Sequence, residues 1–280
     1  MAMNNRLLRP LATPGLLDLV PGAAAAYSLR SLSRSYAGPV VTVRRSSDDA
    51  EDSFTAAEVS DGTLAAFCGA GDGFVKTWHS QTGSNDASQT TAGYQPKIVS
   101  SGIVVLEEGK PALQFDGSDD SLDANAAAST FSGIDKPISI ASVFNCDTGT
   151  GGVFVFSFGN SASNTQMILL RSLSGFVDFY ARDNASQFNQ LFGGSALSQS
   201  VVFVYSNMDT IALRQNGANI GTSTSSLGDA TLNIFSIGCQ TRISKSNFFS
   251  GTMQELIFFP SDLSAQRELI EGNIAWSYSV

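Results

Sequence analysis

Short runs in which apolar side chains recur at alternate positions mark most of the chain after Ile98. Clusters of glycine, asparagine, aspartate and serine separate these runs from one another. The runs cover residues 111–117, 138–145, 152–159, 166–172, 175–183, 200–207, 210–217, 232–238 and 253–259. Alternation places every second side chain on the same face of a strand, and many short strands separated by turn residues are typical of a sandwich. The pattern therefore predicts an all-β fold, a sandwich or jelly roll of antiparallel sheets.

A hairpin and a C-terminal helix can be placed within this pattern. Asn216-Gly217 predicts a tight turn between two strands, because both residue types tolerate positive φ. Near the end of the chain, Ile270, Ile274 and Tyr278 recur every four residues, which predicts a helix with one apolar face. Ser264 is a candidate for the N-cap of that helix.

The first part of the chain follows other patterns. Residues 1–22 are rich in proline and leucine, and proline disfavours helix in the residue before it, so we expect an extended arm that buries its leucines against a partner. Residues 23–36 have apolar positions three and four apart, which predicts a short N-terminal helix. Shorter signals predict strands at 40–45 and 74–78 and a helix at 61–67. We divide the chain into the arm 1–22 and a sandwich 23–280, with an N-terminal elaboration (23–97) and a core (98–280).

Charge is distributed unevenly along the chain, whose net charge is −9. Residues 1–45 hold six arginines and one aspartate, whereas residues 46–280 hold ten basic and 24 acidic residues. Two interpretations stay open: the arginines dock the arm to an acidic partner, or they pair with carboxylates of this protein. The acidic body would repel phosphates, so we expect no nucleic-acid partner. No apolar run is long enough to span a bilayer, so we expect no membrane partner either.

Cysteine and histidine are scarce. Cys68, Cys146 and Cys239 are odd in number and far apart, which argues against a disulfide framework or a zinc site, so we expect three reduced thiols. His79 is the one histidine, and we assign it a structural role, because a lone histidine is weak evidence for catalysis. We expect no catalytic residue, no metal site and no cofactor.

Carboxylates gather in a few places. The loop from Asp116 to Asp123 contains four aspartates, and it is either a solvated turn or a calcium site, because calcium takes several oxygens from one flexible loop. Glu107 and Glu108 precede a glycine, which indicates a solvated turn. Glu255 alternates with apolar neighbours, as an exposed strand residue would.

One stretch is a candidate ligand-binding site. Tyr180, Arg182 and Asn184 occupy alternate positions at the end of a predicted strand, which places them on one face. An amphipathic ring can stack on a sugar, and the guanidinium and amide groups can bind its hydroxyls. The alternatives are a subunit interface and an ordinary polar face.

The later part of the chain resembles laminin-G-type domains. FDGSDDSL (115–122) is similar to their opening strand, and LRQNGANIGTS (213–223) is similar to their central hairpin. Residues 248–276 resemble their last strands and closing helix. The resemblance covers about Phe115 to Tyr278 and implies a concanavalin-like jelly-roll β-sandwich. It implies no particular activity, because this superfamily has diverse functions.

The earlier part resembles the start of the catalytic domains of α-L-arabinofuranosidase B, on residues 26–49 and 72–99. The same block recurs in proteins of bacteriophages. The family reads Trp-Tyr-Asp-Gln where this chain has Trp78-His79-Ser80-Gln81. The resemblance implies a similar sandwich and, in the enzymes, retaining hydrolysis by two carboxyl groups about 5 Å apart. The segment that carries the family's nucleophilic glutamate has no counterpart here, so we expect that this chain is not an enzyme.

These observations predict a structural protein on the exterior of a tailed-bacteriophage virion: a capsid decoration, a head fibre or a tail-fibre component. Prolines and Asp18 interrupt the first apolar run, which argues against a signal peptide and for synthesis in the host cytoplasm. The arm would bind capsid or tail proteins, and the resemblance implies a homo-oligomer, namely a trimer. The first alternative is a carbohydrate-binding adhesin for a host-surface glycan. The second is an arabinofuranosidase-like glycoside hydrolase.

Overall fold

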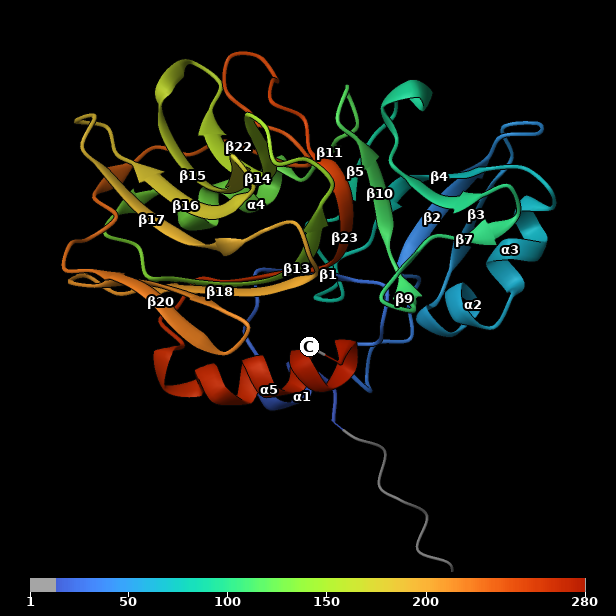
Figure 1. The fold of residues 1–280 in the computed structure, drawn as a ribbon, viewed down its shortest axis with the longest axis horizontal. Helices are drawn as coiled ribbons and strands as arrows, with labels where there is room; N and C mark the ends of the chain where they lie inside the picture. Colours follow the sequence, from blue (N-terminus) through green and yellow to red (C-terminus); the bar gives the residue numbers. More distant parts are fainter. Residues whose placement is uncertain (1–13, 280) are drawn as a thin grey trace, which may run out of the picture.

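The computed structural model describes residues 14–279, and two antiparallel sheets packed face to face form most of the molecule (Figure 1). The first sheet has the order β20, β19, β18, β13, β23, and β23 also pairs with β1 and β10. Its strands are β1 (Ala25–Ser28), β10 (Leu113–Asp116), β13 (Ile138–Cys146), β18 (Ser200–Ser206), β19 (Ile211–Gln215), β20 (Ala218–Ser223) and β23 (Ser250–Phe259). The predicted all-β jelly-roll sandwich is confirmed.

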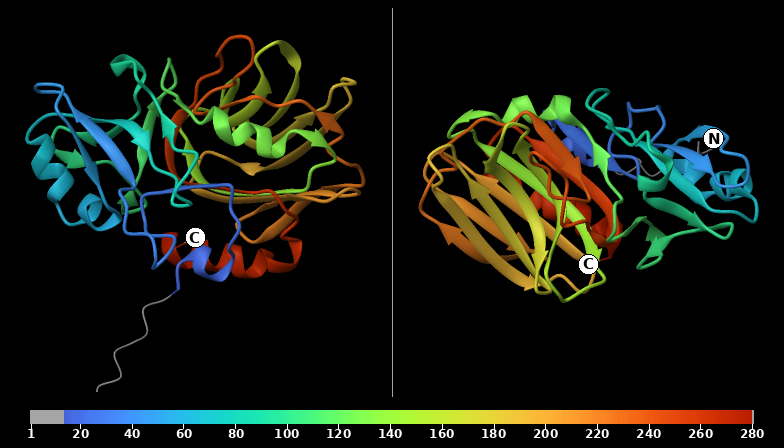
Figure 2. Two further views of the ribbon diagram at one scale, coloured as in Figure 1. Left: turned by 180° about the vertical axis from the view of Figure 1, so that it is seen from behind. Right: turned by 90° about the horizontal axis from the view of Figure 1, so that it is seen from above.

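The second sheet has the order β17, β16, β15, β14, β22, β11, β5, β4, β2, β3. Its strands are β2 (Val41–Arg45), β3 (Glu51–Phe54), β4 (Gly73–Trp78), β5 (Ala87–Ser88), β11 (Leu122–Asp123), β14 (Gly152–Asn160), β15 (Ser163–Leu173), β16 (Phe176–Arg182), β17 (Phe188–Ser195) and β22 (Ile234–Ile237). β6 (Lys97–Ser100) pairs with β10 of the first sheet and β4 of the second, and thereby connects them. Within this arrangement β2, β3, β4 and β7 (Ile103–Val104) lie to one side of the strands from β13 onward (Figure 1 and Figure 2).

Short elements complete the fold. They are α1 (Leu16–Leu19), α2 (Ala56–Ser60), α3 (Thr63–Cys68), α4 (Asn125–Ala128), α5 (Arg267–Tyr278), the 3₁₀ turns η1 (Ala92–Tyr94), η2 (Ser129–Phe131) and η3 (Ser264–Gln266), and the small strands β7 (Ile103–Val104), β8 (Leu106–Glu107), β9 (Lys110–Pro111), β12 (Gly133–Ile134) and β21 (Asp229–Ala230). Among residues 14–279, no helix has the length and apolarity needed to cross a membrane.

Phenylalanine fills the space between the sheets. Phe158 stacks on Phe235 with ring centroids 4.2 Å apart, and Phe156 meets Phe258 edge-on at 4.9 Å. The residues of these rings come from β14, β22 and β23, so the cluster joins both sheets. A bulge in β14 between Phe154 and Phe156 shifts its register against β15, and Phe154 packs outside the main core as a result.

A second apolar layer lies on the outer side of the first sheet. Ile270, Ile274 and Tyr278 of α5 are buried there with Phe203 of β18, as their four-residue spacing predicted. Leu16 of α1 is buried in the same layer, and Figure 1 shows α1 beside α5 below the sheet. The strands β13, β18 and β23 of the first sheet are therefore covered on both faces, whereas the second sheet is covered by the core on one face.

The predicted helix at 23–36 is wrong. Ala25–Ser28 form β1, in which Ala26 lies opposite Ile257 of β23. All four residues of β1 are buried, so the apolar run fills both faces of a strand in the sheet. Pairing with β23 overrides the helical propensity of the alanines. The apolar residues matched a helical spacing by chance, because positions 23–27 are all apolar and fit any period.

Three other local predictions, one turn and two helices, are confirmed. Asn216 and Gly217 have positive φ values of 50° and 77° and join β19 to β20, as predicted. The helix predicted at 61–67 is present as α3, and the C-terminal helix is present as α5, although Gln266 and not Ser264 occupies its N-cap position. Residues 1–13 of the predicted arm lie outside the described residues. Residues 16–19 of that arm are not extended: they form α1, because Leu16 is buried against this protein's own second apolar layer. The predicted division at residue 98 stays a prediction.

Candidate functional site

The outer face of the second sheet carries an aromatic and polar surface built by three strands. Across β15, β16 and β17 the register aligns Arg171, Asp178 and Phe192 in one row. The next rows align Leu169 with Tyr180 and Gln190, and Met167 with Arg182 and Phe188. We call the outward residues of these strands the aromatic face: Met167, Leu169, Arg171, Phe176, Asp178, Tyr180, Arg182, Phe188, Gln190 and Phe192.

A buried ion pair lies in the aromatic face. The Arg171 Nε lies 2.6 Å from Oδ2 of Asp178, whose side chain is fully buried. Gln190 Nε2 donates to the same oxygen at 3.0 Å. The guanidinium of Arg171 also lies over the rings of Phe154 and Tyr180, at 5.5 and 5.7 Å from their centroids. These contacts hold Tyr180 in a fixed orientation on the strand.

Exposed rings surround this ion pair. Phe176, Phe188 and Phe192 are 53%, 62% and 54% exposed, which is unusual for so large an apolar side chain. The ring of Phe188 stacks on that of Tyr180 at 5.7 Å with an interplanar angle of 17°. Phe188 and Phe192 were not among the predicted ligand-binding residues. Their four-residue spacing, which places both on one face of β17, was the signal that could have found them.

The structure brings together two of the three predicted ligand-binding residues. Tyr180 and Arg182 lie on one face of β16, two residues apart. Asn184 lies beyond the end of β16, where strand alternation no longer applies. Its Nδ2 donates to Asp229 Oδ2 at 3.0 Å and to Thr231 Oγ1 at 3.3 Å, so it holds a loop instead of joining the face.

A cavity of about 620 Å³ lies between the N-terminal strands and the sandwich. Its lining combines the Phe74 ring with charged side chains, including Lys97, Asp116, Asp120 and Asp147. Burial raises the pKa of Asp120 to about 7, although the Asp116 N–H donates to its carboxylate and opposes the shift. Burial also raises the pKa of Asp147, with a further contribution from the charge of Glu107.

The fold separates the four aspartates of the loop from Asp116 to Asp123 into two clusters. Carboxylate oxygens of Asp116, Asp119 and Asp120 lie within 4.8 Å of one another at the cavity. Asp123 belongs to another cluster, where it pairs with Lys245 at 2.7 Å and accepts from Ser236 Oγ at 2.6 Å. The solvated turn and the calcium site both stay predictions for the first three residues.

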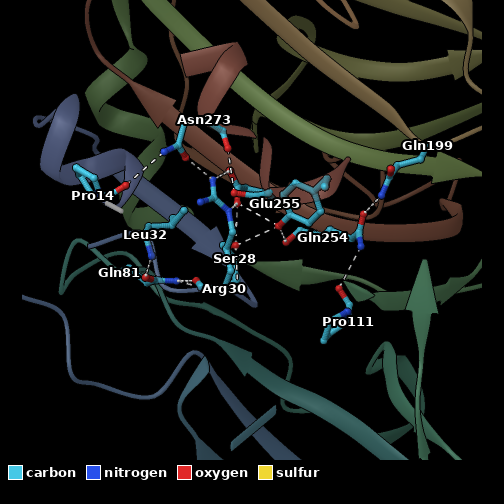
Figure 3. Close-up of polar contacts among 12 residues, drawn as sticks. Pro14, Ser28, Arg30, Leu32, Gln81, Pro111, Gln199, Gln254, Glu255 and Asn273 are labelled. Carbon is cyan, nitrogen blue, oxygen red and sulfur yellow. Dashed lines mark hydrogen bonds and ion pairs between the residues drawn. The ribbon is translucent and has the colours of Figure 1, made fainter. Parts of the chain in front are cut away.

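The predicted exposure of Glu255 is wrong. Its side chain is fully buried, and its Oε2 lies 2.7 Å from the Arg30 Nε, while Ser28 and Tyr278 donate to the same oxygen at 2.8 and 3.1 Å (Figure 3). The reason is the second apolar layer: β23 is covered by the core on one face and by α5 on the other, so alternation there does not indicate exposure. Burial raises the pKa of Tyr278, and the charge of Glu255 adds to that shift.

Other expectations about polar residues can be compared with the structure. Glu108 is exposed in a turn with φ of 47°, as predicted, but Glu107 accepts hydrogen bonds from Asn145 Nδ2 and Thr252 Oγ1. The single histidine, His79, is held between Asp86 and Thr42, at 2.7 and 2.8 Å. The three cysteines are free and buried.

The arginines near the start of the described chain pair with carboxylates of this protein. The partners are Glu255 for Arg30, Asp18 for Arg34, Asp49 for Arg44 and Asp48 for Arg45. The arginines were expected either to dock to an acidic partner or to pair with carboxylates of this protein. Pairing within the protein is confirmed for these four arginines. Arg6 and Arg9 lie outside the described residues.

Comparison with known proteins identifies relatives of the fold. No protein-family model matches the chain, and no curated protein sequence matches it. A mutant GH54 α-L-arabinofuranosidase soaked with 4-nitrophenyl α-L-arabinofuranoside superposes with a TM-score of 0.71 at 16% identity, over 90% of this chain and 62% of the enzyme. An arabinofuranosidase complexed with arabinofuranosyl-α-1,2-xylobiose gives 0.70 at 16% identity, over 92% and 64%. A sialidase carbohydrate-binding module from Ruminococcus gnavus, bound to α2,3-sialyllactose, gives 0.49 at 16% identity, over 59% and 96%.

These matches confirm one part of the predicted resemblance. The likeness to arabinofuranosidases extends over nine tenths of this chain, far beyond residues 26–99, and shows a shared fold. The chain spans less than two thirds of the length of these enzymes. The laminin-G and bacteriophage parts of the resemblance receive no support from these matches and stay predictions.

The same finding contradicts the prediction that this chain is not an enzyme. That prediction rested on a missing counterpart for one family glutamate in the sequence. Structures that share the fold over nine tenths of this chain include glycoside hydrolases, so the architecture is one that supports catalysis in other proteins. At 16% identity the match shows the fold and assigns no activity.

Proposed function

We propose that this chain binds carbohydrate through the aromatic face. The observation that carries the proposal is the stack of Tyr180 on the exposed Phe188 beside the buried Arg171–Asp178 pair. Sugar rings bind proteins by packing their C–H faces on aromatic rings while polar groups bind their hydroxyls. Strands hold all four side chains, so the surface is formed before a ligand arrives, which lowers the entropic cost of binding.

A glycan array with the purified protein tests this proposal. We expect binding to one class of glycan, and loss of that binding in the Tyr180→Ala variant, because the substitution removes the ring that Phe188 and Arg171 contact. Loss of binding supports the proposal only if the variant is still folded, so the thermal unfolding of Tyr180→Ala is measured alongside. If the folded wild-type protein binds no glycan on the array, the proposal is contradicted.

Where this protein is located and what it assembles with is a separate proposal, which rests on the sequence. We propose that it is a structural protein on the exterior of a bacteriophage virion, bound to capsid or tail proteins as a homo-oligomer and able to act as an adhesin. Leu7, Leu8, Pro10 and Leu11 in residues 1–13 support an anchoring arm. Because Leu16 is part of the folded body, deletion of residues 1–13 is the appropriate test. Normal incorporation of the truncated protein into particles would contradict anchoring by that segment.

Glycoside hydrolysis at the cavity is the second candidate function. It is favoured by Asp120, whose raised pKa of about 7 would leave a large fraction of its carboxyl group protonated at neutral pH, beside the carboxylates of Asp116 and Asp119. Glycoside hydrolases use a protonated carboxyl group as acid and a nearby carboxylate as base or nucleophile. Release of nitrophenol from 4-nitrophenyl α-L-arabinofuranoside, abolished by Asp120→Asn, would support it, and absence of turnover would exclude this substrate.

A further inference from the structure

Arg182 has no partner in the part of the chain that the structure describes. It lies on the aromatic face between Met167 and Phe188, and no carboxylate of residues 14–279 forms an ion pair with it. Its Nε is buried and donates a hydrogen bond to no acceptor among the described residues. A buried guanidinium nitrogen without an acceptor is costly, so an acceptor supplied by a ligand would stabilise it.

Arg242 reaches the same part of β15 from another segment. Its Nη1 donates to the Asn164 carbonyl at 3.4 Å and its Nη2 donates to Gln240 Oε1 at 3.0 Å, and both acceptors are neutral. The side chain of Gln240 in turn contacts the Met167 sulfur at 3.9 Å. Arg182 lies opposite Met167 in the sheet, so two arginines without carboxylate partners flank this methionine.

The other arginines of the described chain behave differently. Each forms an ion pair with a carboxylate of this protein: Arg30, Arg34, Arg44, Arg45, Arg171, Arg214 and Arg267. The protein has 25 acidic residues against 16 basic ones, so carboxylates are abundant. Two guanidinium groups that lack carboxylate partners and lie near Met167 form a local site for an anion.

We infer that the aromatic face binds a saccharide that carries an anionic group, a carboxylate or a sulfate, with Arg182 and Arg242 binding the anion. Tyr180 and Phe188 pack against the sugar ring beside it. Guanidinium groups bind both kinds of oxyanion through two parallel hydrogen bonds, which gives orientation as well as affinity. This inference rests on the proposed carbohydrate function and specifies its ligand class.

Matched pairs of oligosaccharides test the inference by titration calorimetry. One arm compares oligogalacturonate with its methyl ester, which differ in the carboxylate. The other compares a heparin oligosaccharide with its desulfated form, which differ in the sulfate. We expect the wild-type protein to bind the charged member of at least one pair about tenfold or more tightly, because a charge-assisted hydrogen bond has that effect. The arm that shows the preference identifies the anion.

Substitutions then assign the preference to the arginines. Arg182→Gln should remove the preference for the charged sugar, and Arg242→Gln should reduce it. Lys110→Gln removes an exposed charge at the start of β9 and should leave the preference unchanged. Equal affinity for charged and neutral sugars, lost in Tyr180→Ala but not in Arg182→Gln, would overturn the anionic ligand and leave the carbohydrate function standing. Absence of binding to every sugar would contradict both.

Discussion

Arg30 and Glu255 are 225 residues apart in the sequence, and they form a two-pronged ion pair in which Nε–Oε2 is 2.7 Å and Nη2–Oε1 is 3.0 Å. The Glu255 side chain is fully buried, and the Arg30 side chain is 21% exposed. Arg30 Nη2 also donates to Asn273 of α5, whose Nδ2 donates to the Pro14 carbonyl. The pair therefore holds the N-terminal segment, β23 and the C-terminal helix together (Figure 3).

Loss of Arg30 should destabilise the fold strongly. Arg30→Ala leaves the Glu255 carboxylate buried without its cation, and such a loss costs about 3–5 kcal/mol of the free energy of unfolding. Urea unfolding measures the change. Arg267→Ala, which breaks an exposed pair with Glu268, should cost less than about 1 kcal/mol. Equal effects of the two substitutions would show that the buried pair has no special role.

Asp120 should make stability depend on pH. Burial raises its pKa from 3.8 to about 7, so the folded protein keeps a proton that the unfolded chain loses at lower pH. The stability that this protonated group contributes is fully present below about pH 4 and is lost as the pH rises to about 7. In Asp120→Asn that loss disappears, which amounts to about 2–4 kcal/mol between pH 4 and pH 7.5.

Urea unfolding at these two pH values checks this prediction. Asparagine keeps the oxygen that accepts the Asp116 N–H, so the loop geometry should survive the substitution. Asp119→Asn, at a less buried neighbour whose charge adds a small contribution to the raised pKa of Asp120, should reduce the pH dependence only slightly. Parallel profiles for the wild type and Asp120→Asn would contradict a raised pKa at this position.

Two glycines offer a matched comparison of backbone constraint. Gly251 of β23 has φ of 146°, and a methyl group there would overlap the carbonyl oxygen of Asn145 on β13. Gly251→Ala should therefore lower the free energy of unfolding by about 1–3 kcal/mol or more. Gly272 of α5 has open space around the same position, so Gly272→Ala should raise it by up to about 1 kcal/mol. Thermal unfolding of both variants measures the difference in sign.

The sequence was sufficient to predict structural features that depend on residues close together in the chain. Alternation along β16 was enough to place Tyr180 and Arg182 on one face, and the Asn216-Gly217 turn followed from backbone preferences. Features that depend on what covers a strand could not be predicted in this way. Glu255 alternates with apolar residues as an exposed residue would, but α5, which follows β23 in the chain, covers that face.

The candidate site shows the same limit. Asp178 and Phe192 are separated by the turn between β16 and β17, and their alignment depends on a register that includes a bulge. The ion pairs of Arg44 and Arg45 are short-range and could have been proposed from spacing, whereas the lack of a partner for Arg182 is visible only in the assembled sheet.

The affinity of Phe188→Ala for the glycan that the wild-type protein binds tests the central claim most directly. Phe188 is exposed, so its removal should leave the fold intact while it deletes half of the aromatic stack. Trp276→Ala is the matched control, because it removes a ring that is 72% exposed on α5, away from the aromatic face. We predict that calorimetry shows a loss of affinity of about tenfold or more for Phe188→Ala and no change for Trp276→Ala. Unchanged affinity in Phe188→Ala would contradict carbohydrate binding at the aromatic face.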